Sequence, residues 1–76
     1  MNDLKNDNEL MVKIFSHTIS DDPQIRAAAY KALSNFQPQE SVVTCLMNGI
    51  NDEEPLVRKA AGASLISLGY LNINTH

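Results

Sequence analysis

The sequence predicts an all-α fold in which two antiparallel helix pairs stack side by side. Hydrophobic residues recur at steps of three and four along most of the chain, as on one face of a helix, and no segment alternates long enough to indicate a strand. In addition, "DDPQIRAAAYKAL" at residues 21–33 returns as "EEPLVRKAAGASL" at residues 53–65, so Pro23 and Pro55 lie 32 residues apart. Self-similarity at this period is typical of stacked helical repeats.

The repeat divides the chain into five parts. We predict a polar N-terminal segment at 1–8, a first repeat at 9–36, an inter-repeat loop at 37–40, a second repeat at 41–70 and a C-terminal tail at 71–76. The two repeats share five identical pairs, namely Pro23 and Pro55, Arg26 and Arg58, Ala28 and Ala60, Ala29 and Ala61, and Leu33 and Leu65.

Each repeat is expected to contain two amphipathic helices with a hydrophobic stripe. The first helices carry theirs at Leu10, Ile14, Phe15 and Thr18, and at Val43, Leu46, Met47 and Ile50. The second helices carry theirs at Ile25, Ala28, Ala29, Ala32, Leu33 and Phe36, and at Val57, Ala60, Ala61, Ser64, Leu65 and Leu68. We expect these stripes to form the core.

The helix boundaries follow from local signals. Asp22 precedes a proline, which is the pattern of an N-cap followed by proline at the first helical position. The second copy has Glu54 there, a weaker cap, so we expect Asp52 to share that role. The proline of "FQPQES" separates the repeats, and Gly49 and Gly69 are expected to end the third and fourth helices.

Composition limits the classes of function. The 76 residues carry a net charge of −3, and no cluster of basic residues with stacking aromatics appears, which argues against nucleic acid as a partner. No secretory signal is apparent, and no apolar run approaches the ~20 residues of a membrane span. The lone Cys45 lies in an apolar run, which favours a small buried hydrophobe in a reducing compartment. We therefore expect a cytoplasmic protein that does not contact membranes.

The acidic turn, the proline and the following "IRAAAYKAL" or "VRKAAGASL" resemble the HEAT repeat, most closely the short HEAT-like repeats of the phycobilin-lyase type, over residues 9–70. The resemblance implies an α-solenoid fragment or mini-domain. It also implies that the arginines Arg26 and Arg58 bond turn carboxylates of their own or the neighbouring repeat, forming a ladder that fixes the stacking. These carboxylates fall on Asp21 or Asp22 and on Glu53 or Glu54, of which we expect Asp22 and Glu54. A guanidinium group suits this role because it can bridge two carboxylates.

Signals of catalysis are absent from the sequence. Some HEAT-like enzymes hold iron through His-Glu pairs, but neither His17 nor His76 is followed by Glu. No Ser, His and acid are arranged for nucleophilic attack, and the glycines lack the spacing of a phosphate loop. We expect no catalytic residue, no bound metal and no cofactor.

The resemblance implies instead a protein or peptide partner on the concave face, which the second helices line. The candidate residues point outward on those helices: Tyr30, Lys31, Ser34, Ala27, Lys59, Ala63 and Ile66. Tyr30 is the strongest candidate, because a tyrosine on a polar face is a good interface anchor. The alternative is that Tyr30 packs over Lys31 or against the neighbouring helix.

The two ends of the stack differ in composition. The C-terminal end carries Ile66, Tyr70, Leu71 and Ile73, and repeat proteins need polar ends and about three units for stability. We expect this end to be covered by self-association or by further repeats, whereas the polar start of the chain suits a solvated cap. The main hypothesis is a non-catalytic interaction or scaffold module. The alternatives are a homo-oligomeric module and an accessory domain of an enzyme such as a lyase-like HEAT protein.

Overall fold

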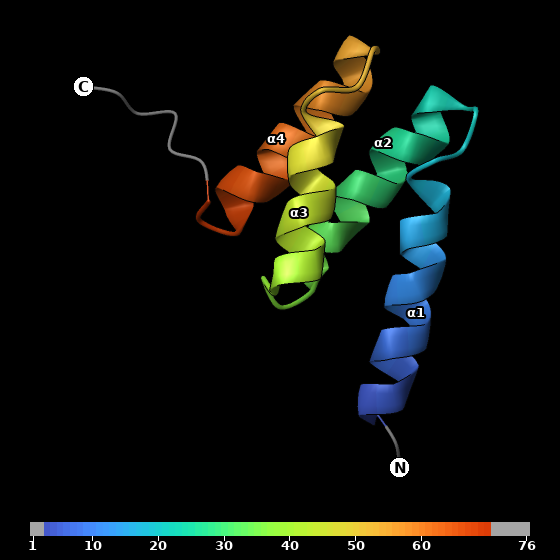
Figure 1. Ribbon diagram of the computed structural model, residues 1–76, viewed down its shortest axis with the longest axis vertical. Coiled ribbons are helices and arrows are strands. Elements are labelled where there is room, and N and C mark those ends of the chain that lie inside the picture. Colours follow the sequence, from blue (N-terminus) through green and yellow to red (C-terminus); the bar gives the residue numbers. More distant parts are fainter. Residues whose placement is uncertain (1–2, 71–76) are drawn as a thin grey trace.

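The computed structural model describes the backbone of residues 3–70 and the side chains of residues 8–70. This part of the chain is all-helical, as predicted, and contains no strand. Its helices are α1 (Asp3–His17), α2 (Pro23–Ala32), α3 (Glu40–Gly49) and α4 (Pro55–Ser67), and a 3-10 turn, Leu33–Asn35, continues α2. In Figure 1, α1 runs antiparallel to α2 and α3 runs antiparallel to α4, giving two helix pairs.

The two pairs stack mainly through their second helices. The contact between α2 and α4 is the most extensive in the described chain, followed by that between α3 and α4. The contact of α1 with α2 is smaller, and Figure 1 shows α1 at the edge of the molecule with α2 between it and α4. The second repeat is therefore the more tightly packed of the two.

The caps of α2 and α4 agree with the sequence. Asp22 is the N-cap of α2, and its carboxylate accepts a hydrogen bond from the backbone N–H of Gln24 at 2.9 Å. Glu54 is the N-cap of α4 but makes no capping bond with its side chain. Asp52 contributes one residue earlier, because its Oδ1 accepts from the N–H of the N-cap Glu54 at 2.9 Å, as the Ser20 hydroxyl does from the N–H of Asp22.

The predicted glycine ends are also present. Helix α3 ends at Gly49, 32 residues after α1 ends at His17. Beyond α4, Gly69 has φ +89°, a left-handed conformation that favours glycine. The N–H of Tyr70 then bonds the carbonyl of Leu65 at 2.8 Å, which closes the helix in a Schellman motif.

The core is shared by both repeats. Its fully buried large side chains are Leu33, Leu46, Leu65, Val42 and Val57. The core prediction is wrong for Met47, which is 38% exposed, and for the outer part of the first repeat. There Ile25 is 43% exposed although its counterpart Val57 is 0% exposed. Leu10 and Ala28 are exposed as well. The reason is position in the stack: Val57 faces the first repeat, while Ile25 faces outward, where the described chain has no further helix pair.

Candidate functional site

The loops that join the helices of each pair meet at one end of the molecule, where Arg26 links the two repeats. Its Nε donates to Oδ2 of Asp52 at 3.0 Å, and its Nη2 donates to Oδ1 of the same carboxylate at 3.1 Å. The two side chains are only 12% and 13% exposed. A third donor, Nη1, reaches the backbone carbonyl of Ser20 at 2.8 Å. Arg26 thus fixes its own loop and the loop of the next repeat together.

In this pair, each of the two groups, Arg26 and Asp52, favours the charged form of the other. The hydrogen bonds from Arg26 hold the pKa of the Asp52 carboxyl below its usual range, and the same bonds raise the pKa of Arg26. A bidentate contact of this kind is more directional than a simple pair of opposite charges.

The predicted acceptors of the arginine ladder are wrong. Asp22 is occupied in capping α2, and Glu54 makes no side-chain hydrogen bond to an arginine among residues 8–70. Asp52 replaces both, since its carboxylate accepts from Arg26 of α2 while Oδ1 also accepts from the Glu54 N–H. One sign of this is visible in the sequence, where Asp52 precedes the weak cap Glu54.

Arg58 occupies the position of Arg26 in the second repeat, but it makes only part of the same contacts. Its Nη1 donates to the carbonyl of Asp52 at 2.8 Å, which matches the bond from Arg26 to Ser20. The rest of its guanidinium forms no hydrogen bond within the described residues, and the side chain is exposed. Arg58 therefore presents at the surface the N–H groups whose equivalents on Arg26 bind the next repeat.

Two of the predicted partner-binding residues are buried, so their assignment to an exposed face is wrong. Tyr30 is 3% exposed, and Ala27 is buried beside it. The hydroxyl of Ser64 in α4 donates to the Tyr30 carbonyl at 2.8 Å, which ties the two helices at this point. Burial raises the pKa of the Tyr30 hydroxyl. Helix α2 is covered on two sides, by α1 and by α4, and the sequence prediction assumed only one.

Small residues in the second repeat make room for the Tyr30 ring. A Cβ added to Gly49 would lie 2.8 Å from Cζ of Tyr30 and 2.7 Å from Cβ of Ala61. Both distances are shorter than the closest approach of non-bonded carbon atoms, so the ring fills the space that the missing side chain of Gly49 leaves. This was the alternative role considered for Tyr30, and the glycine is the signal that could have favoured it.

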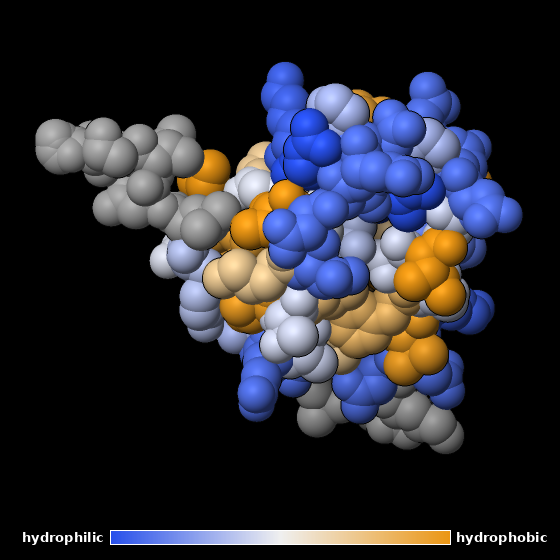
Figure 2. Space-filling model, turned by 45° about the horizontal axis from the view of Figure 1, so that its top comes forward, coloured by the Kyte–Doolittle hydropathy of each residue, from blue (hydrophilic) through white to orange (hydrophobic). Residues whose placement is uncertain are grey.

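The other candidate residues lie at the surface, with one exception. Lys31, Lys59, Ala63 and Ile66 are exposed, whereas Ser34 is partly buried and its hydroxyl donates to the Lys31 carbonyl at 2.8 Å. Figure 2 views the molecule with its loop end tilted forward: hydrophilic residues cover the upper part of that view, and hydrophobic patches lie toward its flanks.

The repeat register identifies the surface that these residues share. On α2, Arg26, Ala27 and Tyr30 lie against the second repeat, and the residues 32 positions later on α4 are Arg58, Lys59 and Gly62. Arg58 and Lys59 are exposed, and a Cβ added to Gly62 would meet no atom within 4 Å. We call the surface formed by Arg58, Lys59, Gly62 and Ile66 the α4 end face.

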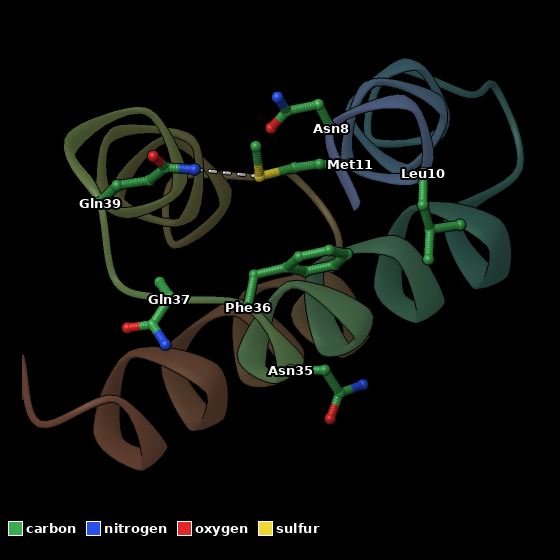
Figure 3. Close-up of a pocket in the computed structure, with 7 residues that line it drawn as sticks. All are labelled: Asn8, Leu10, Met11, Asn35, Phe36, Gln37 and Gln39. Carbon is green, nitrogen blue, oxygen red and sulfur yellow. Dashed lines mark hydrogen bonds between the residues drawn. The ribbon is translucent and has the colours of Figure 1, made fainter. Parts of the chain in front are cut away.

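A hollow of about 440 Å³ lies between α1 and the segment that leads from α2 to α3. It is lined by Asn8, Leu10, Met11, Asn35, Phe36, Gln37 and Gln39. Figure 3 shows Met11, Phe36 and Gln39 facing one another, and Nε2 of Gln39 donates to Sδ of Met11 at 3.3 Å. The sequence did not indicate this hollow, whose polar lining is made of uncharged amides.

The described residues contain no group of three or more His, Cys, Asp or Glu side chains placed to hold a metal ion. His17 is exposed at the end of α1, and His76 lies outside the described residues. Cys45 is half-buried, and burial raises the pKa of its thiol. No helix of the described residues has the length and apolar character needed to cross a bilayer.

Comparison with known proteins agrees with this architecture. The family model of HEAT repeats matches residues 9–72. Neither the curated proteins nor the solved structures contain a match. HEAT repeats generally mediate protein–protein interaction or scaffolding. Because the family model covers most of the sequence and the structure stacks two helix pairs in the same 32-residue register, the chain belongs to the HEAT-repeat family.

Proposed function

We propose that this chain is a non-catalytic interaction module that binds another protein through the α4 end face. The observation that carries this proposal is the difference between its two equivalent arginines. Arg26 uses its guanidinium to hold the loop of the second repeat, while Arg58 presents the same donors at the surface. A partner with a carboxylate at the right place would complete the contact.

The rest of the α4 end face fits a protein partner. Ile66 is 38% exposed and provides apolar area on α4 about two helical turns after the two basic side chains. Gly62 leaves room for a large side chain, as Gly49 does for Tyr30 inside the molecule. An apolar centre beside paired charges is a usual arrangement of an interface.

This proposal moves the predicted contact away from the concave face. The anchor expected there, Tyr30, is buried, and so is Ala27. Lys59 and Ile66 remain candidate contacts on the end face itself, with Ala63 beside them, and Lys31 stays a peripheral candidate.

The environments of Cys45 and Asp52 support a non-catalytic function. The raised pKa of Cys45 favours the thiol over the reactive thiolate, and the Asp52 carboxylate is held by Arg26. The single cysteine of the sequence has no partner for an internal disulfide, and on this basis we propose a cytoplasmic location.

Photo-crosslinking tests the proposed surface. A photoreactive residue placed at Ala63, beside the end face, should give a discrete crosslinked species in cells, and the additional substitution Arg58→Ala should abolish it. The matched control is the same residue at Thr44, an exposed position on α3, where no such species is expected. Equal crosslinking at both positions, or none at Ala63, would contradict the proposal.

A further inference from the structure

We infer that the α4 end face binds the groove between α1 and α2 of a second copy of this chain, so that copies join head to tail. This inference rests on the proposed function and names the partner of the same surface. The observation behind it is that the groove resembles the surface with which the second repeat packs against the first repeat inside the molecule.

The groove lies on the outer side of the first repeat. It encloses about 490 Å³, and the lining residues that matter here are Ile14, His17, Ile25, Ala28 and Ala32. Most of these side chains are apolar, although Ile25 and Ala28 are exposed. An uncovered apolar groove at the end of a helical stack is a surface that gains stability when a helix covers it.

The repeat register relates this groove to the buried interface. The residues 32 positions after Ile14 and Ile25, which both line the groove, are Leu46 and Val57, and both are fully buried. The groove therefore repeats the surface that the second repeat presents to the first, just as the α4 end face repeats the surface that the first repeat presents to the second. One copy carries both halves of the interface, and no other described residue covers either of them.

The sizes of the side chains are complementary across this contact. Inside the molecule, the large Tyr30 of the first repeat fits against the small Gly49 of the second. In a head-to-tail pair, Gly62 takes the place of Tyr30, and His17 takes the place of Gly49. The large and small partners are exchanged, so the total volume stays similar, and such exchanges are tolerated best in packed interfaces.

The charges are complementary as well. The α4 end face carries the two cations Arg58 and Lys59, whereas Asp21 and Asp22 are exposed beside the groove. Ser20 stands where the second repeat has Asp52, so the neighbouring Asp21 supplies the carboxylate for the Arg58 guanidinium. Contacts between exposed charges are screened by salt, and assembly should weaken as ionic strength rises.

Since the two surfaces differ, the contact is heterologous, and pairing leaves one free surface of each kind. Growth can then continue beyond a dimer instead of stopping there. This sets the contact apart from a symmetric dimer made by two α4 end faces.

Sedimentation of the full chain over a range of concentrations tests the inference. The weight-average mass should rise with concentration and pass the mass of a dimer. Ile25→Asp blocks the groove and Ile66→Asp blocks the α4 end face, so each variant alone should remain monomeric. An equimolar mixture of the two should form a dimer and nothing larger, because only one productive contact remains. Val12→Asp, at an exposed position of α1 outside the groove, is the matched control and should assemble like the unsubstituted chain.

Several results would overturn the inference. A monomer at every concentration would do so, and if the Arg58-dependent crosslink to a different protein persisted, the proposed function would still stand. Self-association of the Ile25→Asp variant alone would indicate a symmetric contact between α4 end faces. Helical circular dichroism confirms that each variant is folded, and Ala28→Glu provides a second way to block the groove.

Discussion

The inner interface between α2 and α4 and the α4 end face are built from the same positions of the repeat, yet only one of them is covered. At the inner interface Arg26 binds Asp52 and Tyr30 is buried. At the end face Arg58 has free donors and the place of Tyr30 is taken by Gly62. Identical positions in stacked repeats therefore take their role from their neighbours, and the residues that differ mark the surface that the described part of the chain leaves uncovered.

The largest expected effect tests the inner side of this comparison. Tyr30→Ala should lower the free energy of unfolding by about 3–5 kcal/mol, because it leaves a cavity between α2 and α4. Urea denaturation followed by circular dichroism measures the loss. Tyr30→Phe keeps the ring and serves as the control, with a much smaller effect expected. A loss below about 1 kcal/mol would place Tyr30 at the surface instead.

The next effect concerns the glycine opposite that ring. Gly49→Ala should lower the free energy of unfolding by about 1–3 kcal/mol, because the new methyl group would overlap Cβ of Ala61 and the Tyr30 ring. Thermal unfolding of the variant checks this. An increase in stability would mean that α3 and α4 can move apart without cost, and that the close approach at Gly49 is not required.

A smaller effect, visible through pH, tests the arginine contact. Asp52 has a lowered pKa in the folded chain, so its contribution to stability is fully present above the unfolded pKa of about 3.9 and is lost as pH falls through the folded value. Asp52→Asn should be less stable than the unsubstituted chain at pH 7, and the difference should shrink below about pH 4. Unfolding curves at both pH values measure it. A difference independent of pH would show that the carboxylate charge is not involved.

The smallest effect has the opposite sign. Gly62→Ala should raise the free energy of unfolding by about 0.5–1 kcal/mol, because glycine weakens a helix and the added methyl group meets no neighbour. It is the matched partner of Gly49→Ala, since both change a helical glycine in the second repeat. If both variants lost stability equally, the end face would be as crowded as the inner interface.

Much of the fold could be predicted because its signals are local. The cap at Asp22, the left-handed glycine at position 69 and the core role of Leu33 and Leu65 each depend on a few neighbouring residues. The number and pairing of the helices followed from the repeat. These features need no knowledge of what lies beside a repeat.

The candidate site was harder to predict because it depends on place within the stack. Ile25 and Val57 are equivalent in sequence, but one is exposed and the other buried. Helical spacing identifies one buried side of α2, and Tyr30 lies off that side. It does not reveal that a second side of α2 is also covered, and this is where Tyr30 lies. Asp52 was missed as the acceptor of Arg26 because the two residues lie 26 positions apart, and no local pattern connects them.

The carboxylate of Asp52 has a consequence for how the molecule unfolds. Its Oδ1 accepts from the N–H of Glu54, the N-cap of α4, and, at the same time, from Arg26 in the preceding repeat. Starting a helix is the unfavourable step of its formation, and here that step shares an atom with the contact between repeats. The nucleation of α4 and the docking of the first repeat are thereby coupled, and nearest-neighbour coupling is what makes a stack of repeats melt in one transition. The two repeats should behave as a single cooperative unit.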